Sequence, residues 1–131
     1  MLARTYRCGL DAAIDVVGGR WKALILWALH AEPLRFGELK RKVNGISEKM
    51  LIQALRELEE DEVVHREVFH EIPPKVEYSL TGLGQRLNTA LLPLGDWGEE
   101  NMAGIAKRRG VTPAPLTCDS ASGLLSNTDT V

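Results

Sequence analysis

The chain has 131 residues, a length that suits one domain and leaves no room for two independent hydrophobic cores. With 44% hydrophobic and 26% charged residues it has the composition of an ordinary globular protein, large enough to fold without disulfide or metal staples. The net charge of −2, taken alone, argues against nucleic-acid binding, which often goes with a basic excess.

The charge is unevenly distributed along the chain. Residues 1–56 carry ten Lys/Arg and five Asp/Glu, residues 57–109 carry six and eleven, and residues 110–131 carry two Asp and no base. Between Arg35 and Arg56 there are six basic and two acidic residues. Such a separation indicates an interaction surface that the net charge conceals.

The sequence contains no apolar run near the roughly 20 residues of a membrane-spanning helix, and no signal-peptide-like stretch near its start. We therefore expect a cytoplasmic protein without a membrane partner. Its two cysteines, Cys8 and Cys118, are far apart and belong to no Cys/His cluster, so we expect neither a metal site nor another cofactor.

Apolar residues at helical spacing predict two N-terminal helices. The first begins at Leu10 and ends at Val17, before the Gly18-Gly19 pair. The second, from Arg20 to His30, is apolar nearly all round and should lie at the centre of the core.

Two further helices follow, joined by a turn at Asn44-Gly45. The shorter one, Phe36 to Val43, has an apolar face and a basic face. The longer one begins after Ser47, whose hydroxyl can cap a free backbone N–H, and ends near Asp61. The pair has the spacing of a helix-turn-helix.

A β-hairpin is predicted next, with strands at about 63–72 and 76–80 and with Pro73, Pro74 and Lys75 near its tip. Alternation would place Val64, Val68 and Ile72 on one face. A long helix follows, with Thr81 as its cap and Pro93 expected to kink it.

The predicted fold class is mainly α with a small β-hairpin wing, a winged helix-turn-helix. The domain would span residues 1–109, with the helix-turn-helix at about 36–61, the wing at about 63–80 and the last helix at about 81–108. Residues 110–131 are rich in Pro, Thr, Ser, Gly and Asp and lack aromatics, so they are predicted to be a disordered tail.

This arrangement suits double-stranded DNA, because the second helix of the pair can enter the major groove, where base edges are distinguishable. Lys49, Gln53 and Arg56 are the candidates for base contacts, although Arg56 could instead pair with a phosphate or an acid. The candidates for backbone contacts are Arg35, Lys40, Arg41, Lys42, Ser47 and Lys75. The basic residues could also form a plain solvated face, Ser47 could act only as a cap, and Lys75 could be a simple loop residue.

Several short motifs resemble the HxlR-type winged helix-turn-helix regulators, over about residues 8–98. The matching positions are Cys8, Gly18-Gly19-Arg20-Trp21-Lys22, Arg35-Phe36, Glu38-Leu39, Gly45-Ile46-Ser47-Glu48-Lys49-Met50-Leu51, Leu55-Arg56-Glu57-Leu58, Pro73-Pro74-Lys75-Val76-Glu77-Tyr78-Ser79-Leu80-Thr81, Gly84 and Trp97-Gly98. The resemblance implies a homodimeric bacterial transcription factor, more often a repressor, with its first and last helices in the dimer interface and a pseudo-palindromic operator.

The resemblance also bears on regulation. Some relatives sense oxidants or electrophiles through one N-terminal cysteine, the position of Cys8, although Gly9 stands where the family commonly has proline. Cys8 could equally be inert, or Cys118 could resolve its oxidised form. A small ligand at the dimer interface is the alternative effector, while Trp21, Trp27 and Trp97 are expected to serve packing.

Two other classes of function compete with DNA binding. A winged-helix module that binds proteins is favoured by the acidic second half and opposed by the basic helix-turn-helix. An enzyme would need a nucleophile with a base, a carboxylate pair or a metal cluster, and none is evident in the sequence, so no catalysis is expected.

Overall fold

The computed structural model describes residues 5–113; Cys118 and residues 114–131 of the predicted tail lie outside this part. In chain order the elements are α1 (Gly9–Val17), α2 (Trp21–Ala28), β1 (Leu34–Arg35), α3 (Phe36–Lys42), α4 (Glu48–Glu60), β2 (Val64–Phe69), β3 (Lys75–Leu80) and α5 (Gly82–Arg109). Among the described helices, none is long and apolar enough to cross a membrane. The mainly helical fold class is confirmed.

The core lies where α2, α3 and α4 meet the base of the sheet. As predicted, α2 is central, and α4 buries one stripe of leucines at helical spacing. The largest fully buried side chains are Ile25, Leu26, Leu34, Leu39, Leu51, Leu55 and Leu58. This core fixes α3 and α4 relative to each other and leaves their polar faces outside.

The sheet has three antiparallel strands in the order β1-β3-β2, one more than the predicted hairpin. The additional strand, β1, pairs Leu34 with Tyr78 and is only two residues long, too short to show any periodicity in the sequence. The prediction for Ile72 is wrong: β2 ends at Phe69, and Ile72 lies in the hairpin loop with its side chain fully exposed.

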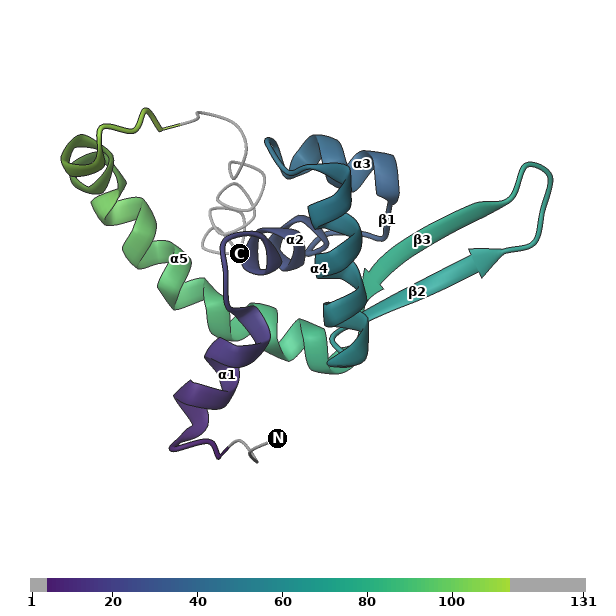
Figure 1. Ribbon diagram of the computed structural model, residues 1–131, viewed down its shortest axis with the longest axis horizontal. Helices are drawn as coiled ribbons and strands as arrows, with labels where there is room; N and C mark the ends of the chain where they lie inside the picture. The colour runs from purple at the N-terminus through teal and green to yellow at the C-terminus, as the bar shows by residue number, and fades with distance from the viewer. Residues whose placement is uncertain (1–4, 114–131) are drawn as a thin grey trace, which may run out of the picture.

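The β2–β3 hairpin projects from the body of the protein as a wing (Figure 1). Its base is anchored, because Val64 is buried and Tyr78 and Leu80 pack against the core. Farther out, the side chain of Val68 is exposed. The wing is therefore held at one end and free at the other.

The long helix α5 is capped as predicted: the hydroxyl of Thr81 accepts from the Gly84 N–H at 3.0 Å and donates to the Glu62 carbonyl at 2.7 Å. Pro93 lies inside this helix, which changes direction along its length (Figure 1). The buried Asn88 donates from Nδ2 to the Leu26 carbonyl at 2.9 Å and so connects α5 to α2.

Candidate DNA-binding surface

The helix-turn-helix consists of α3, the turn after it and α4. Gly45 in the turn has a φ of 94°, a conformation that favours glycine. Ser47 then caps α4 as predicted, since its Oγ accepts from the Met50 N–H at 3.1 Å. Ser47 and the residues of the first turn of α4 are exposed, so the start of this helix is free to approach another molecule.

The exposed face of α4 carries all three predicted base-reading residues. Lys49, Gln53 and Arg56 are spaced i, i+4 and i+7 and are all exposed. Ile52 lies on the same stripe and Met50 beside it, both with substantial exposure. The sequence analysis did not select these two apolar residues, although helical spacing from Lys49 identifies Ile52. Apolar side chains at such positions suit the methyl group of thymine.

Gln53 is engaged within the protein. Its Nε2 donates to Glu57 Oε2 at 2.5 Å, while Lys22 Nζ lies 2.6 Å from Glu57 Oε1. The hydrogen bond from Gln53, and next the contact with Lys22, hold the pKa of Glu57 below its usual range. Lys22 connects α2 to the last turn of α4, a role that the sequence could not show because 35 positions separate Lys22 from Glu57.

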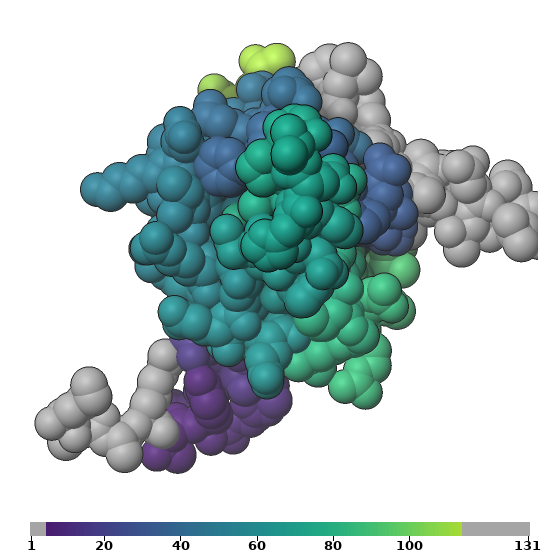
Figure 2. Space-filling view, turned by 90° about the vertical axis from the view of Figure 1, so that its right-hand side faces the viewer, coloured from purple at the N-terminus to yellow at the C-terminus, as the bar shows by residue number. Residues whose placement is uncertain are grey.

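The basic residues of α3 lie in its last turn, where positive charge also stabilises the helix dipole. Lys40, Arg41 and Lys42 are all exposed. The exposed Arg35 stands just before α3, and its backbone N–H donates to Glu38 Oε1 at 2.8 Å. Viewed along the wing, the blue surface of α3 and the start of α4 lies beside the hairpin (Figure 2).

On the wing, Lys75 is the first residue of β3 and lies next to the tip, which residues 70–74 form. Its Nζ is 3.5 Å from Glu77 Oε2 and 4.7 Å from the centre of the Phe69 ring. These neighbours hold Lys75 against the hairpin. Arg66, which the sequence analysis did not single out, is exposed on β2 opposite Tyr78.

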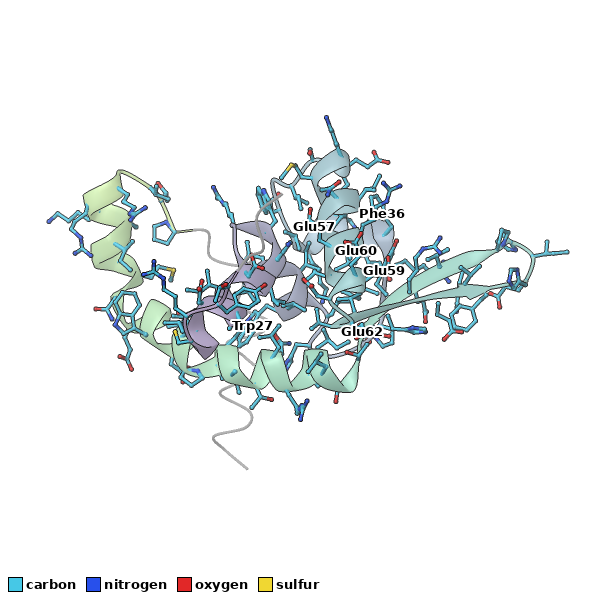
Figure 3. The ribbon with its side chains drawn as sticks, turned by 60° about the horizontal axis from the view of Figure 1, so that its bottom comes forward. Trp27, Phe36, Glu57, Glu59, Glu60 and Glu62 are labelled. Atoms are coloured by element: carbon cyan, nitrogen blue, oxygen red, sulfur yellow. The ribbon has the colours of Figure 1, made fainter. Side chains whose placement is uncertain are left out.

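The acidic residues after Arg56 are placed away from the start of α4. Figure 3 shows Glu59, Glu60 and Glu62 toward the end of this helix, near the base of the wing. Most acidic residues of α4 therefore lie in its last turn, although Glu48 is in the first, and the end that begins at Ser47 is the less acidic one and suits a polyanion better.

Cys8 stands at the position just before α1, with its side chain exposed. The thiol makes no capping hydrogen bond to the helix.

The fold and this surface define a winged helix-turn-helix, the architecture in which the second helix of the pair enters the major groove. The model of the HxlR-like helix-turn-helix family matches residues 16–105. The chain belongs to this family, as its motifs predicted.

Individual relatives agree with this assignment. The chain is 45% identical to a regulatory protein, MalR, of Fusobacterium mortiferum over 73% of this chain and 92% of the relative. It resembles the redox regulator HypR in its oxidised form with 45% identity and a TM-score of 0.68, over 72% of this chain and 97% of HypR. It also resembles the reduced form of the transcriptional regulator YodB of Bacillus subtilis with 37% identity and a TM-score of 0.65, over 71% and 92%.

Proposed function

We propose that this protein is a homodimeric transcriptional repressor that binds double-stranded DNA in the bacterial cytoplasm, in association with the nucleoid. The observation that carries the proposal is the exposed stripe of Lys49, Gln53 and Arg56 on α4, behind the Ser47 cap and beside the basic end of α3. The first turn of α4 would enter the major groove, and α3 and the wing would contact the flanking backbone.

Homodimerisation is supported by the apolar surfaces of the two terminal helices. In the described chain α1 buries none of its residues, and it exposes 69% of Leu10 and 54% of Ile14. On α5, Trp97 is 57% exposed and Leu83 is 46% exposed. A second copy would cover these side chains. Two-fold symmetry then predicts a pseudo-palindromic operator with half-sites about 10 base pairs apart, or a multiple of that.

The DNA-binding residues divide into two groups with different expected effects. Lys49 and Gln53 would contact base edges, and Gln53 must first release Glu57 to offer its amide to adenine. Contacts to phosphates are expected from Arg35, Lys40, Arg41, Lys42 and Lys75. The Ser47 hydroxyl and Arg56 would also contact phosphates where Ser47 does not only cap α4 and Arg56 does not pair with an acidic residue of the protein. Phosphate contacts set affinity and salt dependence without reading sequence.

A binding titration with the DNA upstream of its own and adjacent genes tests the proposal. Lys49→Ala or Gln53→Ala should relax sequence preference, whereas Lys42→Ala should weaken binding to all sequences and lower the salt slope by about one. Arg86→Ala, which removes an exposed charge from α5, is the matched control and should change neither quantity. If the wild type shows no salt-sensitive, sequence-selective binding, the proposal is wrong and a protein-binding module remains.

We also propose that Cys8 is an oxidant- or electrophile-sensing residue. The proposal is supported by its exposure beside α1 and by similarity to HypR, a redox regulator. Treatment with diamide should change DNA affinity in the wild type and leave Cys8→Ser unaffected. Cys118→Ser tests whether the second thiol resolves the oxidised one. An equal response of Cys8→Ser and wild type would refute the role of Cys8.

A further inference from the structure

A cavity of about 580 Å³ separates α2 from the second half of α5, away from the DNA-binding surface. α2 and the residue that caps it contribute lining residues at helical spacing, which therefore form a single face: Arg20, Ala23, Leu24 and Trp27. The volume lies within the range of small-molecule sites, which is about 300–1,000 Å³.

Two glycines of α5 keep this cavity open. A methyl group on Gly95 would stand 3.8 Å from the indole of Trp27, which forms part of the wall (Figure 3). A methyl group on Gly98 would meet no atom within 4 Å. Since Ile25 and Leu26 of α2 are fully buried on the other side, the space is a hollow beside the packed core rather than a defect in it.

The lining is apolar except near one end. Leu24, Trp27 and Met102 belong to the apolar part. α2 and α5 run in roughly opposite directions (Figure 1), so Arg20, just before α2, and Arg109, the last residue of α5, line the cavity toward the same end. Among the described residues that line the cavity, the charged ones are Arg20, Arg109 and Glu99, so two guanidinium groups stand against one carboxylate.

The exposed side chain of Arg20 contacts its neighbour Trp21, which is not among the cavity-lining residues. Its guanidinium carbon lies 5.0 Å from the centre of the Trp21 ring, a cation–π contact that limits the freedom of the side chain. A cavity with an aromatic wall and a positive end complements a molecule that is apolar along most of its length and anionic at one end.

We propose that this cavity binds a small apolar molecule carrying one anionic group, with its ring or chain against Trp27 and its charge at Arg20 and Arg109. This inference rests on the proposed function, for which it supplies an effector site. The same helix α2 carries Lys22, which contacts Glu57 of α4, so a ligand that shifts α2 acts on the DNA-binding helix. Trp97 does not line the cavity and remains available to a second copy.

Fluorescence titration of the full chain with anilinonaphthalenesulfonate, an aromatic anion, tests the site. We expect saturable binding of one probe per chain and displacement by naphthoate. The neutral naphthalenemethanol should compete about tenfold less well, since it cannot make charge-assisted hydrogen bonds to the arginines. Combined Arg20→Gln and Arg109→Gln substitutions should erase that difference; equal competition by the two compounds in the wild type would refute the anionic end.

Gly98→Leu is the variant that fills the cavity, and Ala103→Leu, on the exposed side of α5 outside the lining, is its matched control. Probe binding should be lost in the first and kept in the second. If Gly98→Leu leaves probe binding intact, or if it dissociates the dimer in sedimentation experiments while Ala103→Leu does not, the ligand assignment is overturned.

Naphthoate should also change the DNA affinity of the wild type but not of Gly98→Leu. Binding of naphthoate without any change in DNA affinity would overturn the effector role. If the wild type fails to bind DNA without any ligand, the proposed function is refuted instead. The two failures are distinguishable, because the probe titration tests the cavity without DNA.

Discussion

Gly84 sits where the start of α5 meets the turn between α4 and β2, and we expect Gly84→Ala to destabilise the protein severely. A Cβ at this position would stand 2.0 Å from the carbonyl oxygen of Val63, whereas ordinary contact begins at 3.4 Å. The helix would have to withdraw by about 1 Å or more. The atom in the way belongs to the backbone, so no side-chain rotation relieves the overlap.

The expected loss of stability follows from the hydrogen bonds at this junction. The Val63 carbonyl accepts from the Thr81 N–H at 3.2 Å, and the Thr81 hydroxyl donates to the Glu62 carbonyl. Overpacking costs about 1–3 kcal/mol, and each hydrogen bond that the withdrawal breaks adds about 1 kcal/mol. A total near 3 kcal/mol lowers Tm by roughly 12–24 °C in a domain of this size.

Urea and thermal unfolding followed by circular dichroism measure this loss, at one fixed protein concentration because a dimer's stability depends on it. Gly82→Ala is the matched control, in the same helix and with nothing within 4 Å of the added methyl group. Its free energy of unfolding should stay within about 0.5 kcal/mol of wild type or rise slightly. Equal stabilities of the two variants would refute the close-contact reasoning.

Three further substitutions test the side-chain contacts. Asn88→Ala removes the buried donor to the Leu26 carbonyl of α2 and should cost about 1–3 kcal/mol in the same unfolding assay. Ser47→Ala should cost about 1 kcal/mol by loss of the cap, and an unchanged midpoint would contradict that role. The pKa of Glu57 is lowered in the folded protein. The stabilisation of the fold by the Glu57 carboxylate is therefore present above the ordinary pKa of 4.5 and is lost as the pH falls through the lower folded pKa. The stability gap between wild type and Glu57→Gln should therefore narrow below about pH 4.5 and stay constant above it, which unfolding midpoints across pH will show.

Local chemistry explains which features could be predicted. The cap of Ser47 and the leucine stripe of α4 depend on residues one to four positions apart, and both were correct. Strand β1 exists only because Leu34 pairs with Tyr78, far along the chain, so no local pattern marks it. Ile72 continues the apolar alternation of β2, but pairing between strands ends the ladder at Phe69.

The candidate DNA-binding site shows the same division. Spacing along α4 placed Lys49, Gln53 and Arg56 on one exposed face. Their partners were not predictable in the same way, because the Lys22 contact to Glu57 joins two helices. The cavity between α2 and α5 likewise depends on how the helices cross, which composition and periodicity do not specify.

The wing is held at its base and unsupported beyond it, which has a consequence for the entropy of binding. Val64 is buried in the core, whereas farther out Val68 is exposed, and neither Val68 nor the half-buried Val76 belongs to the core. Slow local opening should therefore be graded, with outer amides exchanging before those beside Leu80. On DNA the outer hairpin would lose this freedom, so part of the contact energy gained there would be offset by ordering, while α4 enters the groove already rigid.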